Sequence, residues 1–145
     1  MNGLGSLRKR WKMKPKFRAW DVHEKKMFTN DQLIIWNGNV YANDNSELNV
    51  NNLKGWSIDE KCLMQSTGNK DKNGKEIFEG DIIKFFDCDG DGYTVPMVWD
   101  NDYACFSVDW GSNMLTSFDY LEEFYTDLKD IEVIGNIYEN LSLIC

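Results

Sequence analysis

Acidic residues alternate through one short segment in a pattern that can bind calcium. Asp87, Asp89 and Asp91 precede Gly92 and match the beginning of an EF-hand loop, whose alternating carboxylates supply oxygen ligands. The complete loop needs a bidentate glutamate at its twelfth position, where this sequence has Val98. The flanking runs are rich in β-branched and aromatic residues and predict strands instead of the two helices that the motif requires. We therefore interpret the segment as a hairpin loop with clustered acids, where binding of a divalent cation would be adventitious.

Other residue types that catalyse reactions or bind metals are sparse. The one histidine, His23, lies in a predicted charged turn and is interpreted as an exposed turn residue rather than a catalytic base. The four cysteines lack the C-x-x-C spacing of a zinc site. The sequence also has no phosphate-binding glycine loop, no G-x-S-x-G and no H-E-x-x-H. We expect no catalytic residues, no metal site and no cofactor; a small enzyme with an unidentified substrate is kept as an alternative.

The cysteines and the hydrophobic runs indicate a compartment. Cys62, Cys88 and Cys105 lie in or beside apolar runs, where a reduced and buried thiol is the default. Such free thiols are typical of a reducing cytoplasm. No apolar run approaches the roughly 18 residues of a membrane span, and no apolar region follows the basic residues near the N-terminus as in a secretory signal. We therefore expect a cytoplasmic protein with no membrane partner.

The distribution of charge argues against nucleic-acid binding by the folded part. The formal net charge is −8, and four of the 16 Lys and Arg residues lie within residues 8–12. The rest of the chain carries a net charge of about −12, which repels phosphate backbones because cations that displace counterions drive duplex binding. An acidic surface suits solubility, or a basic protein partner. Residues 1–12 are interpreted as a flexible basic extension, with a basic arm that contacts nucleic acid as the alternative.

The elements that would position these residues are organised around residues 63–86. A polar loop is expected over residues 66–75, where Asn73-Gly74 allows the chain to reverse. Glu79-Gly80-Asp81 predicts a second bend, with Gly80 at positive φ, before a strand over residues 82–86. Six Trp, six Tyr and eight Phe favour strands over a helical bundle throughout the chain.

Turn and strand signals recur on both sides of this stretch. Asn37-Gly38 between two apolar runs predicts a tight hairpin over residues 33–42. Pro96 predicts that its strand is an edge strand or carries a bulge, and Gly135 predicts a bulge or a close backbone approach in the last strand.

One helix is expected, over residues 117–128. Apolar residues recur there at spacings of three and four, which indicates a face that packs on the core, with Ser117 or Asp119 capping the start. The predicted core stripe consists of Phe118, Leu121, Phe124, Tyr125 and Leu128.

Three segments carry a resemblance to a known family. MKPKFRAWD at residues 13–21, LMQSTGNKDKNGKEIFEGDIIKF at 63–85 and EVIGNIYEN at 132–140 occur in the order found in the YopX family of bacteriophage and prophage proteins, which this chain resembles from Met13 onward. The pattern T-G-x-x-D-x-x-G-x-x-I-x-E-G-D-I in the central segment is specific. The resemblance implies a small, mostly β protein that acts in the cytoplasm of a bacterial host cell, and it implies no catalytic residues.

The predicted fold is mainly β. It comprises an N-terminal β-hairpin lobe over residues 13–60 and a small SH3-like β-barrel over residues 61–145, with the helix covering one opening of the barrel. An α+β domain with a single sheet is the alternative.

The leading functional hypothesis is a phage or prophage accessory protein of non-enzymatic type that binds a host or phage protein. The alternatives are a nucleic-acid-associated β-barrel, which the acidic charge makes the weaker case, and the small enzyme mentioned above. Self-association stays open. The predicted partner-binding residues lie in two loops: Asp87, Asp89, Asp91, Asp71 and Lys72.

Overall fold

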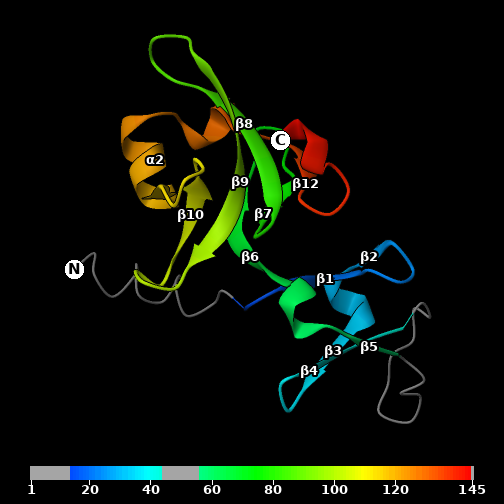
Figure 1. Ribbon diagram of the computed structural model, residues 1–145. Helices are drawn as coiled ribbons and strands as arrows, with labels where there is room; N and C mark the ends of the chain where they lie inside the picture. The colour runs from blue at the N-terminus through cyan, green and yellow to red at the C-terminus, as the bar shows by residue number, and fades with distance from the viewer. Residues whose placement is uncertain (1–13, 44–55, 145) are drawn as a thin grey trace. The chain divides into compact units, whose positions relative to one another are not determined.

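The computed structural model describes residues 14–43 and 56–144 (Figure 1). The protein is mainly β, with a curled half-barrel sheet and one α-helix in the described part, which confirms the predicted fold class. The chain forms two compact units, Met1–Gly68 and Asn69–Cys145. The basic extension, the Asn-rich segment from residue 44 and Cys145 lie outside the described residues.

The first unit is built from short antiparallel strands. Strand β1 pairs with β2 on one side and with β6 on the other, while β4 lies between β3 and β5. Two 3₁₀ turns, Asn30–Gln32 and Glu60–Cys62, each lead directly into a strand. The strands are β1 (Phe17–Asp21), β2 (Lys26–Phe28), β3 (Leu33–Trp36), β4 (Asn39–Ala42), β5 (Trp56–Ile58) and β6 (Leu63–Lys70).

The Asn-Gly hairpin forms as predicted. Asn37 and Gly38 have φ values of 49° and 77°, and Trp36 pairs with Asn39 across the turn. Both central residues therefore adopt the left-handed conformation that a two-residue hairpin requires. The buried apolar side chains of this unit come from both of its sheets and from the turn Glu60–Cys62: Ala19, Trp20, Phe28, Val40, Ala42, Ile58, Cys62 and Met64.

The second unit is a curled sheet with the helix packed against it. Its five-stranded sheet has the order β11-β10-β9-β8-β12, and every pairing is antiparallel (Figure 1). Helix α2 (Phe118–Phe124) contacts β10 and β11. The 3₁₀ turns Leu128–Asp130 and Leu141–Leu143 precede and follow the last strand. The strands are β7 (Glu76–Phe78), β8 (Asp81–Phe86), β9 (Gly92–Asp100), β10 (Cys105–Asp109), β11 (Leu115–Ser117) and β12 (Glu132–Asn136).

One hydrophobic core stabilises this unit. Alternation along β8 sends Ile83 and Phe85 inward while Lys84 and Phe86 face solvent, as the period of a half-buried strand requires. The core cluster also takes one or two residues from each neighbouring element: Ile77, Val95, Met97, Val108, Phe118, Leu121, Ile131 and Val133.

The predicted polar loop over residues 66–75 is largely wrong. β6 extends through Lys70, so only residues 71–75 form a turn. The Asp71 N–H donates to the Lys75 carbonyl at 2.8 Å, and the Gly74 N–H donates to the Asp71 carbonyl at 3.0 Å. Polar residues such as Gln65 and Thr67 are half-buried in the strand, because sheet pairing and not apolar patterning determines its length.

Pro96 does not lie in an edge strand, and the register around it is regular. Residues 92–96 of β9 pair with β8, whereas residues 97–100 pair with β10. Pro96 is thus the last residue of one ladder and immediately precedes the other. A residue without an N–H is tolerated at this point because neither ladder continues through it.

The two glycine predictions are confirmed. Gly80 has a φ of 84° and donates its N–H to the Met97 carbonyl at 2.7 Å. At Gly135 the register of β12 against β8 shifts, which is a β-bulge. An added Cβ there would lie 2.5 Å from Oδ1 of Asn140, so any other residue would force the Asn140 side chain to move.

The helix is shorter than predicted. Ser117 caps it, because its hydroxyl accepts a hydrogen bond from the Tyr120 N–H at 3.3 Å, but the helix ends at Phe124. The Asp127 side chain accepts from the Lys129 N–H at 3.1 Å and starts a separate 3₁₀ turn. Such a local side-chain bond competes with continuation of the helix.

Only part of the predicted helix stripe is core. Phe118 and Leu121 are buried, whereas 58% of Phe124 and 38% of Tyr125 are exposed. Among the cysteines, Cys62 is buried as expected, Cys105 is half-buried and Cys88 is exposed in the loop after β8, which corrects the prediction for Cys88. No helix in the described part of the chain is long and apolar enough to cross a membrane.

Candidate partner-binding surface

Exposed aromatic rings on α2 continue a chain of ring contacts that begins in the core. Buried Phe85 lies 6.0 Å from Trp110, and Trp110 lies 6.0 Å from Tyr125, between ring centroids. Tyr120 lies 6.3 Å from Tyr125 and 4.4 Å from Phe124. Aromatic pairs at these separations attract each other beyond the area that they bury. The surface rings are therefore held in place by the interior of the unit.

Trp110 connects the core to the surface rings and is itself fixed. Its indole Nε1–H donates to the Thr116 hydroxyl at 2.8 Å, and it packs edge-on against Tyr93 at 5.4 Å. Thr116 belongs to β11, so this bond also ties the end of β10 to the strand that leads into α2. The arrangement positions the helix on the sheet.

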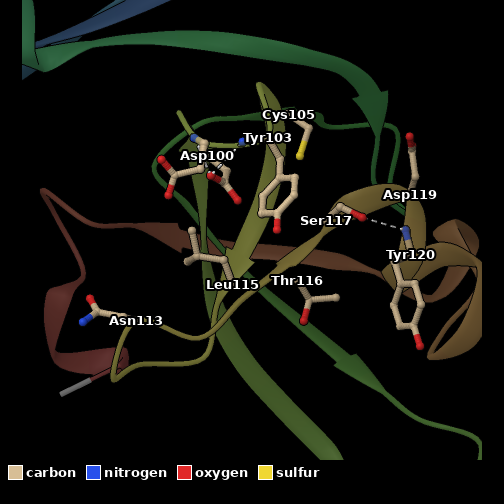
Figure 2. A pocket seen from close by; sticks show the side chains of 10 residues that line it. Asp100, Tyr103, Cys105, Asn113, Leu115, Thr116, Ser117, Asp119 and Tyr120 are labelled. Carbon is tan, nitrogen blue, oxygen red and sulfur yellow. Dashed lines mark hydrogen bonds between the residues drawn. The ribbon is translucent and has the colours of Figure 1, made fainter.

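A groove of about 740 Å³ lies beside this helix. One wall comes from the end of β9, the turn after it and the first residue of β10; the other comes from the turn before β11, from β11 and from the first turn of α2. Figure 2 shows the lining side chains, with Tyr103 and Leu115 near the centre and the Ser117–Tyr120 capping bond dashed. Tyr103 is 81% exposed and Leu115 is 41% exposed, so the groove offers apolar surface to a ligand.

Asp100 shapes the turn that forms the first wall. Its Oδ1 accepts hydrogen bonds from the N–H groups of Asp102 at 2.9 Å and Tyr103 at 3.3 Å, while the residue as a whole is 8% exposed. This Asx turn projects the Tyr103 ring outward, and Ala104 completes it at a φ of 51°. Asp100 Oδ2 accepts no hydrogen bond from any residue that the structure describes.

The charge of the groove is uniformly negative. Asp100, Asp102 and Asp119 line it, and its lining contains no Lys, Arg or His. Another acidic residue, Glu122, lies on the same helix. Burial, with the charges of Asp119 and Asp127, raises the pKa of Glu122 above its ordinary value of 4.5.

The structure separates the predicted partner-binding residues into exposed and structural ones. Residues 87–91 form the predicted β8–β9 hairpin loop, with Asp89 and Asp91 exposed. Asp87 instead organises this loop, since its Oδ1 accepts from the N–H groups of Asp89 and Asp91 and its Oδ2 accepts from the Tyr93 hydroxyl at 3.0 Å.

The Asp87–Tyr93 pair shifts both pKa values. The Asp91 N–H, with the Tyr93 hydroxyl and further backbone donors, lowers the pKa of Asp87 despite partial desolvation. The hydrogen bond to Asp87 raises the pKa of Tyr93 above 10.0. No group of three or more His, Cys, Asp or Glu that could hold a metal ion occurs among the described residues.

Asp71, another of the predicted partner-binding residues, is buried and bonded to the backbone. It is 7% exposed and accepts three backbone hydrogen bonds, from Asn73 at 2.9 Å, Lys75 at 2.8 Å and Val133 at 2.9 Å. Burial is the largest influence and raises its pKa, but these donors and the Lys75 charge outweigh it and hold the pKa below 3.8. Lys72 is exposed and pairs with Glu132 at 3.3 Å.

The groove beside α2 is not predicted from the sequence. Its two walls come from residues 100–105 and 113–120, and nothing local shows that Tyr103 and Leu115 lie together. One signal was present: Asp100-Asn101-Asp102 between two strand-like runs is a turn sequence, and a large aromatic residue directly after such a turn is a candidate for exposure.

These features define a small, mainly β protein with a half-barrel and a helix-bordered groove. The model of the YopX protein family matches residues 16–144, and the chain belongs to this family. No curated protein matches it.

Two solved structures share the fold. Protein EF1440 from Enterococcus faecalis is 26% identical, with a TM-score of 0.57 over 92% of this chain and 99% of that one. Protein yopX from Bacillus subtilis is 21% identical, with a TM-score of 0.55 over 90% of this chain and 98% of that one.

Proposed function

We propose that the chain is a phage- or prophage-encoded accessory protein of the bacterial cytoplasm that binds another protein of the phage or the host and catalyses no reaction. The observation that carries this proposal is the set of exposed rings on α2, which the core holds in place. Tyr120 is 49% and Phe124 58% exposed. Rigid aromatic residues at a surface provide large contact area at low entropic cost, and they are typical anchors of protein interfaces.

The charges of the second unit favour a protein partner over a nucleic acid. The groove beside α2 has no cation in its lining. A second hollow, of about 370 Å³, places Lys72 and Lys84 beside Asp87, Asp130 and Glu132, so that charges there nearly cancel. Binding to phosphate backbones needs a surplus of cations. We expect no retardation of single- or double-stranded DNA by the protein in a mobility-shift assay at low salt.

Affinity capture with a matched variant tests the proposal. The tagged chain and its Tyr120→Ala/Phe124→Ala variant are each used to capture proteins from phage-infected bacteria, followed by mass spectrometry. We expect a protein that is retained by the parent and lost by the variant, because both rings leave the interface. Trp36→Ala is the control, since Trp36 is also exposed, at 73%, but lies in the first unit. The absence of any specifically retained protein, or equal retention by the variant at unchanged thermal stability, would contradict the proposal.

A further inference from the structure

The groove beside α2 combines features that restrict what it can bind. Three carboxylates and no cation line it, and the side chains of Tyr103, Leu115 and Tyr120 add exposed apolar surface. An anionic ligand would meet uncompensated repulsion, and a purely apolar one would desolvate the carboxylates without replacing their hydrogen bonds. A ligand that carries both positive charge and apolar side chains satisfies the whole lining.

Asp100 gives the groove a specific acceptor. The residue as a whole is 8% exposed, and the Asx turn uses only Oδ1, which accepts from the N–H groups of Asp102 and Tyr103. Its Oδ2 has no donor among the described residues and belongs to a side chain that lines the groove. A guanidinium or ammonium group supplies N–H donors and the opposite charge together, and such charge-assisted bonds are about twice as strong as neutral ones.

We propose that the groove binds a basic peptide segment of the partner protein, with an Arg or Lys side chain among the carboxylates of Asp100, Asp102 and Asp119 and an apolar side chain against Tyr103 and Leu115. This inference rests on the proposed function and names the chemistry of the partner. The rings of Tyr120 and Phe124 continue the apolar surface beyond the groove, because Tyr120 lines it and its ring lies 4.4 Å from that of Phe124, between centroids.

The test titrates the full chain with defined peptides and follows backbone amide shifts by NMR. The probe is acetyl-Arg-Trp-Arg-Leu-Lys-amide, and the reference peptide has Gln in place of every cation. We expect the basic peptide to shift amides of residues 100–105 and 113–120, with affinity that falls as salt rises, and the Gln peptide to bind at least about tenfold more weakly. No shifts with the basic peptide, or equal affinity for the Gln peptide, would overturn the proposal.

Paired charge variants separate the groove from general attraction to an acidic protein. Asp102→Asn/Asp119→Asn removes two exposed carboxylates at the groove, and Asp89→Asn/Asp91→Asn removes two exposed ones from the hairpin loop. The loop lies at the opposite end of the nine-residue β9, about 26 Å away along the strand, well beyond a Debye length of about 8 Å. We expect the groove variant to bind about fivefold to tenfold more weakly and the loop variant to bind within about twofold of the parent. Equal losses in both would overturn the proposal.

A third comparison tests the apolar part and keeps the two proposals distinguishable. Tyr103→Ser removes a ring that is 81% exposed, so it leaves the fold intact while lowering peptide affinity; Trp36→Ser, at 73% exposed, leaves affinity unchanged.

If a captured partner depends on Tyr120 and Phe124 but not on Asp102 and Asp119, the proposed function holds and the basic-segment inference fails. If the peptide binds the groove but no protein is captured, the inferred chemistry of the groove holds and the proposed function fails.

Discussion

At the residue scale, Asp71 shows how one carboxylate stabilises two parts of a fold. Its Oδ1 closes the turn between β6 and β7, and its Oδ2 accepts from Val133, 62 positions away in β12. The Lys72 N–H adds a parallel bond to the Ile131 carbonyl at 2.8 Å. The T-G-x-x-D pattern therefore contains an aspartate that holds a turn against the last strand.

Asp71→Ala should lower the free energy of unfolding by about 3 kcal/mol, because three backbone donors, one of them in a buried hydrogen bond, lose a charged acceptor. Asp89→Ala, at an exposed loop position, should change it by less than about 0.5 kcal/mol. Urea unfolding followed by tryptophan fluorescence measures both. Similar losses in the two variants would contradict the structural role of Asp71.

The pH dependence of stability gives a second measure of the same contact. Because the pKa of Asp71 is held below 3.8 in the folded protein, its stabilisation is complete above that pH and is lost as the pH falls through the lower folded pKa. The stability difference between the parent and Asp71→Asn should thus be largest at neutral pH and shrink below about pH 3.8.

Local sequence signals made the turns predictable, whereas the bond between Asp71 and the distant Val133 N–H could not be predicted. Asn37-Gly38 and Gly80 need positive φ for reasons contained in their own neighbourhoods. Asp71 instead looked like one more polar residue in a turn, because its burial depends on Val133, which sequence spacing does not bring near.

At the element scale, α2 is a seven-residue helix that contains three acidic residues, Asp119, Glu122 and Glu123. Sequence periodicity placed its start and its two buried residues, Phe118 and Leu121, correctly. It could not place the end, since the Asp127 side chain starts a new turn and leaves Phe124 at the surface. Phe124 and Tyr125, which the periodicity assigned to the core, are exposed and belong to the candidate partner-binding surface.

Glu122→Gln should raise the melting temperature slightly at neutral pH. The pKa of Glu122 is raised by burial and by Asp119 and Asp127, so the folded state disfavours its charged form. The gain should appear as the pH rises above 4.5 through the raised folded pKa and vanish at lower pH, where both side chains are neutral. Thermal scans across this range check the sign; a gain that persists below pH 4 would contradict it. Glu123→Gln, at an exposed position of the same helix, is the matched control.

At the scale of the whole molecule, the second unit has a hydrophobic core cluster made of its own residues. The core cluster of the second unit lies entirely between Ile77 and Val133. Composition and turn spacing indicated the mainly β class, whereas the assembly of the half-barrel required strand pairings between residues far apart in the chain, such as β8 with β12.

Residues 61–145, expressed alone, should fold. The fragment retains β6 to β12, α2 and every member of the core cluster. We expect dispersed amide resonances and a cooperative unfolding transition, as for a small single domain. The Leu121→Ala variant of the fragment is the control, because truncating a fully buried residue should cost about 3 kcal/mol and shift the transition. A collapsed spectrum from the parent fragment would show that residues 1–60 are needed for folding.

The position of Pro96 has a consequence for the pairing of β9. Pro96 has no N–H, so neither hydrogen-bonded ladder of β9 gains a backbone donor at the point where the two ladders meet. Val95 and Met97, which flank the proline, are both buried. The proline therefore marks the boundary at which β9 changes partner, with β8 paired before it and β10 after it.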